Sequence, residues 1–481
     1  MSESLKEKTA KGLFWGALNS GTTQVLNLVF GIVLGRLLSP ADYGIVGVLT
    51  IFTAIAGNLQ SSGFTQGLIN LKHPTRNDYN SVFWFNVLVS VSVYAVLFFC
   101  APLIAKFFHE PRLTTLSRFV FLGFVISSLG ITSNAYMTKN MMNRELMVCS
   151  GVALLGSGIV GTTLAFNGFA YWSLAWQQVV YITLLNLGRF YYTPRIANFH
   201  IDFGPVRRMF RFGMRLLVTN IINTISQNVL TFIFGRLYPM RAVGNFSQAY
   251  KWNNMADSFV ANTVGQIAQP VMVSVKEERG REKQVFRKMM RFTAFLSFPA
   301  MFGLALVANE FIMLTIGPKW VDSVILLQML CISGAFFPFY TLYQNLTISN
   351  GRSDIYMWCN IGQIVLQILI IVALHSFGIN VMVAAYSLFL ILWLAVWHGI
   401  AYRLTGVTAM ETLKDTLPFC LAAFVTMAIT YGLTFFMHSN VLLFLSRIII
   451  ASVVYFMIMK LSHAVILEEC LKFAKTKLKR K

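Results

Sequence analysis

The sequence predicts an all-α protein that crosses a membrane many times. Of its 481 residues, 56% are hydrophobic and only 12% are charged, and the mean hydropathy is +0.64. Apolar runs long enough to cross a hydrocarbon core of about 30 Å recur between short polar breaks. A transmembrane β-barrel would instead show short segments of alternating polarity. This composition excludes an ordinary soluble domain and indicates a bundle of membrane-spanning helices.

About fourteen transmembrane helices are expected, taken in chain order from the continuous apolar runs. Their predicted ranges are 14–38, 45–69, 81–105, 113–137, 146–166, 170–192, 212–237, 243–269, 289–316, 323–349, 354–374, 379–402, 417–437 and 440–462. An even number of spans places both termini on the same side of the membrane.

The net charge is +21, and the Lys and Arg residues that produce it are unevenly divided between the two sides of the membrane. If both termini are cytoplasmic, 26 of the 39 Lys and Arg residues fall in inner segments and six fall in outer segments. This is the positive-inside pattern of an inner-membrane protein, so the basic excess does not indicate nucleic-acid binding. The basic tail from Ala464 to Lys481 has an apolar face at helical spacing, which predicts a helix on the anionic inner membrane surface.

The N-terminus leads directly into a full-length span and lacks the short apolar core of a secretory signal, so we expect no leader to be removed. The six cysteines have no C-x-x-C spacing and fall mostly within apolar runs. They are typical of small core residues, and no disulfide, metal site or cofactor is predicted.

A motif recurs two hundred residues along the chain. The sequence GRLLSPADYG at 35–44 closes the first predicted span, and GRLYPMRAVG at 235–244 closes the seventh. Six spans separate the copies, so both halves enter the membrane in the same sense. We therefore expect two six-helix lobes, 1–200 and 201–405, related by a pseudo-twofold axis along the membrane normal, followed by two extra helices and the tail in 406–481.

Asparagine and glutamine are concentrated in four predicted spans. The first, second, seventh and eighth spans hold 17 of them, whereas the other ten spans together hold 14. Helical spacing places several polar residues of each span on one face. The residues expected to line a shared wet cavity are Asn19, Thr23, Asn27, Asn58, Gln66, Asn220, Asn223, Gln227, Asn254 and Ser258. The alternative is that these side chains only join helix to helix.

Two charges lie deep within the eighth predicted span. Lys251 is about eight residues, or about 12 Å, inside the span, and Asp257 is near its middle. A charge at that depth is costly unless it is paired or hydrated, so both are candidate functional residues. A structural lysine–aspartate pair is the alternative. Most other charges within spans lie near a span end, where long side chains reach the interface; Arg447 is deeper and is expected to pack against the bundle.

No enzyme motif accompanies these features. The sequence has no HExxH, no Walker loop and no long outer segment for a catalytic domain. GSGIVG at 156–161 matches GxGxxG formally, but it lies within an apolar span with no preceding strand. Close helix packing explains this glycine pattern, and a non-enzymatic function is expected.

The N-terminal stretch KGLFWGALNSGTTQVLNLVFGIVLGRLLSPADYGIVGV resembles the opening of the Wzx-type polysaccharide flippases, most closely the colanic-acid-exporter group. This group belongs to the polysaccharide-transporter branch of the multidrug/oligosaccharidyl-lipid/polysaccharide (MOP) superfamily. The resemblance implies two lobes that alternate between inward-open and outward-open states and move an undecaprenyl-diphosphate-linked oligosaccharide to the outer leaflet. It also implies a cationic cavity among the first, second, seventh and eighth spans, and a groove for the lipid tail at the last two spans.

Under this resemblance the charged residues acquire expected roles. A diphosphate needs compensating cations in a low-dielectric space, and Lys251 and Arg215 are the leading candidates. Arg36 and Arg236 lie at symmetric outer rims, where either could attract a diphosphate or brace a loop carboxylate. Asp42 offers such a carboxylate near Arg36, which favours bracing there.

Other functions and partners remain open at this stage. A multidrug cation antiporter would need an acidic site, yet the first and seventh spans contain no Asp or Glu; Asp257 keeps that alternative open. A glycan polymerase or ligase would need a large outer loop, and a chain-length regulator a large exterior domain. We expect a monomer that contacts lipid-linked oligosaccharide, membrane lipids and polysaccharide polymerase or chain-length machinery. A coupling ion, H⁺ or Na⁺, is not identified by the sequence.

Overall fold

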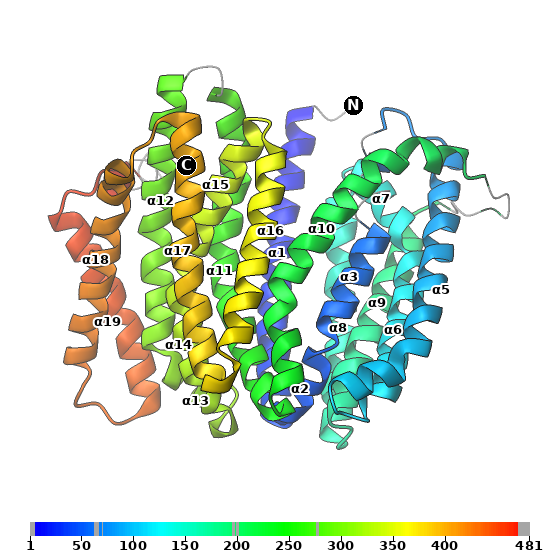
Figure 1. Ribbon diagram of the computed structural model, residues 1–481, viewed down its shortest axis with the longest axis horizontal. Helices are drawn as coiled ribbons and strands as arrows, with labels where there is room; N and C mark the ends of the chain where they lie inside the picture. Colours follow the sequence, from blue (N-terminus) through cyan, green and yellow to red (C-terminus); the bar gives the residue numbers. More distant parts are fainter. Residues whose placement is uncertain are drawn as a thin grey trace. The chain divides into compact units, whose positions relative to one another are not determined.

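The computed structural model describes residues 5–61, 67–69, 71–194, 198, 202–275 and 279–469. Within these ranges the ordered elements are helices, with no strand (Figure 1). The predicted all-α fold class is therefore confirmed. Helices suit a membrane because each backbone N–H and C=O group finds its hydrogen-bond partner within the same helix.

The chain divides into two units, Met1–Gly244 and Asn245–Lys481. The first unit contains the helices α1 (Leu5–Leu37), α2 (Pro40–Gly47), α3 (Thr50–Ser61), α5 (Arg76–Phe107), α6 (Leu113–Leu129), α7 (Ile131–Lys139), α8 (Asn143–Phe166), α9 (Tyr171–Tyr192) and α10 (Gly204–Leu237). Here α8 packs against α1 and α9, and α10 packs against α3 and α5.

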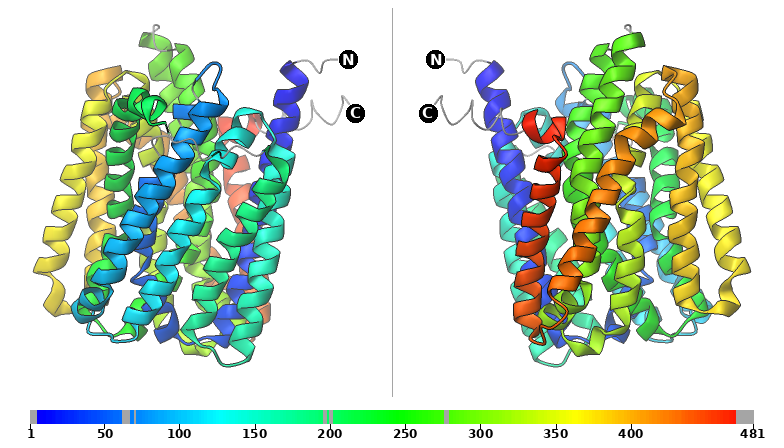
Figure 2. Two further views of the ribbon diagram at one scale, coloured as in Figure 1. Left: turned by 90° about the vertical axis from the view of Figure 1, so that its right-hand side faces the viewer. Right: turned by 90° about the vertical axis from the view of Figure 1, so that its left-hand side faces the viewer.

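Helix α11 (Met240–Val275) begins at the end of the first unit and continues into the second. The remaining α-helices are α12 (Arg279–Leu306), α13 (Ala308–Thr315), α14 (Asp322–Gly334), α15 (Phe337–Ser349), α16 (Ser353–Ala373), α17 (Ile379–Thr405), α18 (Ala409–Leu433) and α19 (Asn440–Leu461). Two short 3₁₀ turns, Pro318–Trp320 and His375–Phe377, join them. The last two helices lie side by side as a hairpin (Figure 2).

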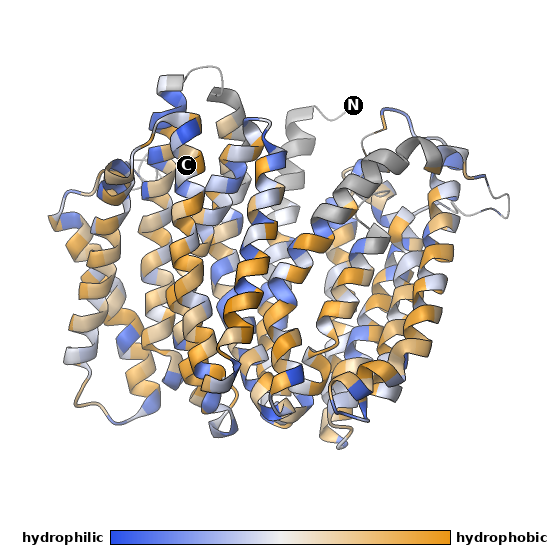
Figure 3. Cartoon of the chain, viewed as in Figure 1, coloured by the Kyte–Doolittle hydropathy of each residue, from blue (hydrophilic) through white to orange (hydrophobic). Residues whose placement is uncertain are grey.

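Every predicted span contains helix, but the exact count of fourteen is not confirmed. Among the described residues, nine helical segments are long and apolar enough to cross a membrane, or ten if the bent pair α6 and α7 forms one span. Apolar residues run along helices such as α5, α17 and α19 (Figure 3). The two-lobe division at residues 200 and 405 stays a prediction.

The span expected at 113–137 is broken at Gly130, where α6 and α7 meet at 42°. Asn186 of α9 fills the break: its Nδ2 donates to the Ile126 carbonyl oxygen at 2.5 Å. A Cβ at Gly130 would lie 1.8 Å from Asn186 Oδ1, so only glycine admits this side chain. A polar side chain thus satisfies backbone near a helix break, as kinks within a membrane require.

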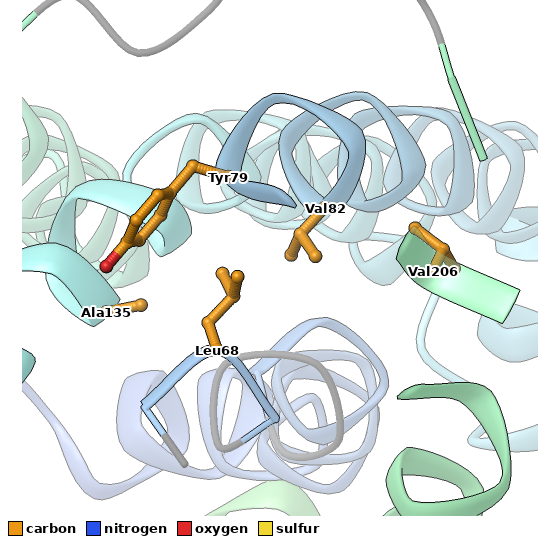
Figure 4. Packing of buried hydrophobic residues seen from close by; sticks show 5 residues of the cluster. All are labelled: Leu68, Tyr79, Val82, Ala135 and Val206. Atoms are coloured by element: carbon orange, nitrogen blue, oxygen red, sulfur yellow. The ribbon is translucent and has the colours of Figure 1, made fainter. Parts of the chain in front are cut away.

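At one end of the first unit a small apolar cluster joins segments far apart in sequence (Figure 4). Its buried members are Leu68, Tyr79, Val82, Ala135 and Val206. They come from the segment after α3 and from α5, α7 and α10, so the start of α10 is anchored within the first unit.

The repeated motif forms a close backbone contact within the first unit. A Cβ at Gly44 would lie 1.9 Å from the Met240 carbonyl oxygen, and a Cβ at Gly244 would lie 1.7 Å from the Pro40 carbonyl oxygen. The contact is reciprocal, because each glycine meets the residue that starts the other helix. The two copies therefore pack against each other at α2 and the first turn of α11, which explains why both end in glycine.

Alanine at Gly44 or Gly244 should lower stability by about 1–3 kcal/mol or more, because the added Cβ would overlap a carbonyl oxygen that belongs to backbone. Thermal unfolding of the purified variants in detergent measures the change. Gly151→Ala on α8 is the matched control, since a Cβ there has no neighbour within 4 Å. Equal stability of the Gly44→Ala, Gly244→Ala and Gly151→Ala proteins would contradict the close packing.

Candidate functional site

Helix α11 carries polar side chains on more than one face. Gln248, Asn253 and Asp257 are buried, with exposed fractions of 0%, 6% and 6%. Asn253 Oδ1, Asp257 Oδ1 and both amide atoms of Gln248 have no hydrogen-bond partner among the described residues. Buried polar atoms of this kind cost free energy unless water or a ligand satisfies them. The helix is therefore suited to a site that holds water or polar groups of a ligand.

Lys251 is half-buried; three residues after Gln248, it shares that residue's side of α11 and lies on a different face from Asn253 and Asp257. Its Nζ is 5.3 Å from the ring centroid of Trp252, within the range of a cation–π contact. Asp257 is not its partner among the ion pairs of the described residues. The polar face predicted around Lys251 includes Asn254, which is exposed, and Ser258, which is half-buried.

In the first unit, several predicted cavity residues are engaged in bonds between helices. Asn19 Oδ1 on α1 accepts from Ser150 Oγ of α8 at 2.6 Å. Asn58 Nδ2 on α3 donates to the Asn220 carbonyl oxygen of α10 at 3.4 Å and also to Thr224 Oγ1. The helix-joining role that was the alternative thus applies to these side chains.

The other predicted residues of this unit are placed as follows. Thr23 and Asn27 on α1 and Asn223 on α10 are half-buried, and Gln227 is exposed. Gln66 lies outside the described residues, as does the side chain of Arg215.

The rim residues are placed near the repeated motif. Asp42 belongs to a capping box at the start of α2: its Oδ2 accepts from the Ser39 backbone N–H at 2.9 Å, and its own N–H donates to Ser39 Oγ at 3.3 Å. Arg36 is exposed. Arg236 contacts the His109 ring nitrogens at 2.5 and 2.8 Å through Nη1, and its guanidinium lies 5.4 Å from the Phe107 ring centroid.

An ion pair lies beside this rim, in the loop between α5 and α6. Arg112 Nε donates to Glu110 Oε1 at 2.7 Å, and Nη2 donates to Oε2 at 2.9 Å. This two-point contact holds the pKa of the Glu110 carboxyl below its ordinary value, chiefly through the hydrogen bond from Arg112. The rim is therefore a charged surface with both signs present.

The second unit contains an apolar groove of about 540 Å³ between α12, α18 and α19. Its lining comprises Phe295, Leu296, Pro299, Ala300, Gly303, Leu304, Leu306, Val307, Met427, Arg447, Ile448, Ala451, Ser452, Tyr455, Phe456, Met459 and Leu467. The wall is hydrocarbon apart from a few polar side chains. Such a groove can hold an apolar chain and offers little to a polar solute.

Family membership follows from residues 33–325, which match the family described as "Polysaccharide biosynthesis protein". The chain belongs to this family. A similar sequence is the "Lipopolysaccharide biosynthesis protein WzxC" of Escherichia coli, 26% identical over 361 residues that cover 73% of this chain and 72% of that protein.

The fold is shared with solved transporters. The "Lipid II flippase MurJ, inward closed conformation" matches with a TM-score of 0.79 at 13% identity, covering 94% of this chain and 99% of that one. An inward-facing multidrug resistance MATE family transporter of the MOP superfamily matches with a TM-score of 0.62 at 14% identity, covering 80% and 96%. This polysaccharide biosynthesis family member therefore has the fold of the MOP superfamily, as the sequence resemblance predicted.

At one end of the groove this family member has a buried ion pair between Arg447, which was expected to pack against the bundle, and Glu310, which was not predicted as its partner. Arg447 Nη1 on α19 donates to Glu310 Oε2 of α13 at 2.9 Å and to the Leu306 carbonyl oxygen at 3.1 Å. Its Nε donates to Thr434 Oγ1 at 3.2 Å. Leu306 ends α12, so its carbonyl has no partner within its own helix. One guanidinium thus satisfies a carboxylate, a hydroxyl and an unpaired backbone group.

A second ion-pair cluster joins α12 to α18 nearer the Arg279 end of α12. Arg287 Nε and Nη2 donate to the two carboxylate oxygens of Asp415 at 2.6 and 3.2 Å, and Nη1 donates to Glu411 Oε1 at 3.1 Å. Lys283 Nζ pairs with Glu411 Oε2 at 2.8 Å. Arg447 was recognised from the sequence as a deep charge, and Glu310 could have been suspected as a lone charge in an apolar stretch, but their pairing could not be predicted.

Arg447→Leu should destabilise the protein by about 3–5 kcal/mol, because it leaves Glu310 buried without its counter-charge. Replacing both residues with leucine should recover most of that loss. Unfolding measurements on the two single variants and the double variant give the coupling between them. A double variant no more stable than Arg447→Leu would show that the pair is not what holds α19 to α13.

Proposed function

We propose that the protein is a flippase that moves an undecaprenyl-diphosphate-linked oligosaccharide repeat unit across the bacterial inner membrane by alternating access, for export of a capsule, O-antigen or similar polysaccharide. The observation that carries the proposal is the combination, in one unit, of a long apolar groove and a helix rich in unsatisfied polar groups. A lipid-linked sugar is an amphiphile, and its two parts need these two environments.

The groove between α12, α18 and α19 is proposed to hold part of the polyprenyl chain. Its volume of about 540 Å³ lies within the range of about 300–1,000 Å³ that is typical of ligand pockets, and its apolar wall suits hydrocarbon. The family name and the fold shared with a lipid II flippase support this assignment.

The polar faces are proposed to hold the diphosphate and the sugars. Lys251 has no carboxylate partner among the described ion pairs, so its charge is available to a phosphate. Arg215 is proposed as a second cation, and Arg36 and Arg236 as rim residues. Amide and hydroxyl groups hydrogen-bond sugar hydroxyls. Asn19 and Asn58 are left out of the proposed set because their side chains already bond to neighbouring helices. The remaining proposed residues are Thr23, Asn27, Gln66, Asn220, Asn223, Gln227, Asn254 and Ser258. Asp257 is proposed to face the same hydrated space.

The proposed orientation has both termini in the cytoplasm and the rim at Arg36 and Arg236 outside; the distribution of basic residues supports it. Polymerase and chain-length proteins are the proposed partners, and the chain is proposed to act as a monomer without a cofactor. A proton or sodium ion is the proposed class of coupling ion, if transport is coupled.

The rival functions have less support. A multidrug antiporter of the same superfamily shares the fold, and the buried Asp257 is the one feature that favours it. The net positive charge of the chain and the apolar groove suit an anionic lipid better than a drug cation. Glycan polymerase or ligase activity has no motif to support it.

Deletion of the gene should cause lipid-linked, unpolymerised repeat units to accumulate on the cytoplasmic side of the membrane, because synthesis continues while translocation stops. Extraction and mass analysis of the lipid-linked intermediates, combined with their protection from an external glycosidase, measures this. Accumulation of exported but unpolymerised units would indicate a polymerase, and loss of drug resistance with normal polysaccharide would indicate a drug pump.

Lys251→Ala should abolish polysaccharide export while the protein still inserts into the membrane, because the diphosphate would lose its counter-charge. Complementation of the deletion strain, with membrane abundance measured by immunoblot, tests this. Lys414→Ala is the matched control, since Lys414 is an exposed lysine on α18. Normal polysaccharide output from Lys251→Ala would refute the assignment of this residue.

A further inference from the structure

Two basic side chains, Arg291 and Lys288, lie beyond the apolar groove towards the Arg279 end of α12. The groove residues Phe295, Pro299 and Gly303 follow one another at four-residue spacing on α12. The same face continues back to Arg291, four residues before Phe295, and to Lys288, seven residues before it. On the facing side, Leu467 lines the groove, and Glu469, two residues further on, pairs with Lys288. Charged side chains therefore begin where the apolar lining ends.

Arg291 has unused capacity to donate hydrogen bonds. Both oxygens of its neighbour Asp415 already accept from Arg287, at 2.6 and 3.2 Å. Arg291 Nε lies 3.6 Å from Asp415 Oδ1, which is beyond hydrogen-bond distance, and this Nε is buried with no partner among the described residues. The rest of its side chain reaches solvent or lipid, with an exposed fraction of 37%.

Among the described residues, Lys288 has one ion-pair partner, in an exposed contact. Its Nζ lies 2.7 Å from Glu469 Oε2, and the two side chains are 56% and 47% exposed. Exposed pairs of this kind add little free energy, so the ammonium can exchange Glu469 for another anion. Lys283 and Arg287, by contrast, are fixed by Glu411 and Asp415. Arg291 and Lys288 are thus the two cations of this cluster that a ligand can use.

The distances along α12 suit a lipid with one long chain. From Phe295 to Val307 the groove face extends about 18 Å at 1.5 Å per residue, roughly one leaflet of a bilayer of about 30 Å. A chain in the groove would place its headgroup beside Arg291. The groove of about 540 Å³ is lined almost entirely by hydrocarbon, so it suits part of a long apolar chain whose charged headgroup lies outside it.

We propose that Arg291 and Lys288 form a diphosphate-binding position at the mouth of the groove, separate from Lys251, where the carrier lipid is held before its sugars enter the polar cavity. The inference rests on the proposed function and adds a loading step to it. Under the orientation proposed above, the Arg279 end of α12 faces the cytoplasm, where the lipid-linked unit is made. The guanidinium and the ammonium supply charge-assisted hydrogen bonds to the phosphate oxygens, with no covalent step.

The test measures how strongly the full-length protein prefers undecaprenyl diphosphate over undecaprenol, which has the same chain without phosphates. Binding is titrated in neutral detergent and followed by native mass spectrometry. In a Lys251→Ala background the preference should persist, because the position at the mouth is intact. Adding Arg291→Gln and Lys288→Gln should reduce it about tenfold or more, the loss expected for one charge-assisted hydrogen bond.

A matched control removes two exposed positive charges of the same unit elsewhere, with Arg352→Gln and Arg403→Gln in the same background. Retained binding of undecaprenol shows that the variants are folded. If the preference survives Arg291→Gln with Lys288→Gln, or if the control pair reduces it equally, this proposal is wrong while the proposed function stands. If the wild-type protein binds neither lipid, the proposed function itself is contradicted.

Discussion

A polar group at membrane depth has to find a partner, because hydrocarbon offers none. Arg447 meets this requirement through three partners: its guanidinium donates to Glu310, Thr434 and the Leu306 carbonyl at the end of α12. Asn186 does the same at the break between α6 and α7, where it satisfies the Ile126 carbonyl. In both places a helix ends or bends and a side chain from another helix supplies the missing bond. At these two places, the buried polar side chain is therefore explained by the end or bend of the helix that it contacts.

The need of a buried polar group for a hydrogen-bond partner also distinguishes structural polar residues from candidate functional ones. Asn19 and Asn58 in the first unit have protein partners, so their polarity is accounted for by packing between helices. On α11, Gln248, Asn253 and Asp257 retain buried atoms without a partner among the described residues. Water or a ligand has to supply those bonds. Of the helices predicted to be rich in amides, α11 is therefore the one on which the transport hypothesis depends most.

Composition and the apolar runs predicted the fold class, because a chain that crosses a membrane has to hydrogen-bond its own backbone groups, and a helix does this within each apolar run. Breaks in the helices could not be predicted in the same way: Gly130 resembles any glycine in an apolar run, and its partner Asn186 lies 56 residues away in the sequence. The repeat at Gly44 and Gly244 was found by its spacing, but spacing does not indicate that the two copies touch. The structural role of Asp42 can be recognised from its neighbours in the sequence. Ser39, three residues earlier, forms a capping box with it at the start of α2.

Directional bonds join the helices that line the groove towards both of its ends. At one end, Arg287 ties α12 to Asp415 and Glu411 of α18. Towards the other end, Arg447 ties α19 to Glu310 of α13. Between these contacts the walls are apolar, and in a bilayer apolar walls gain little by closing, since lipid chains contact them as favourably as other side chains do. A gap fixed by ion pairs and lined by hydrocarbon therefore fills with a lipid chain. Under the proposed function, the carrier's chain would enter by exchange with bulk lipid, at small cost in desolvation. Selectivity for the carrier would then come from the charged groups that bind its phosphates.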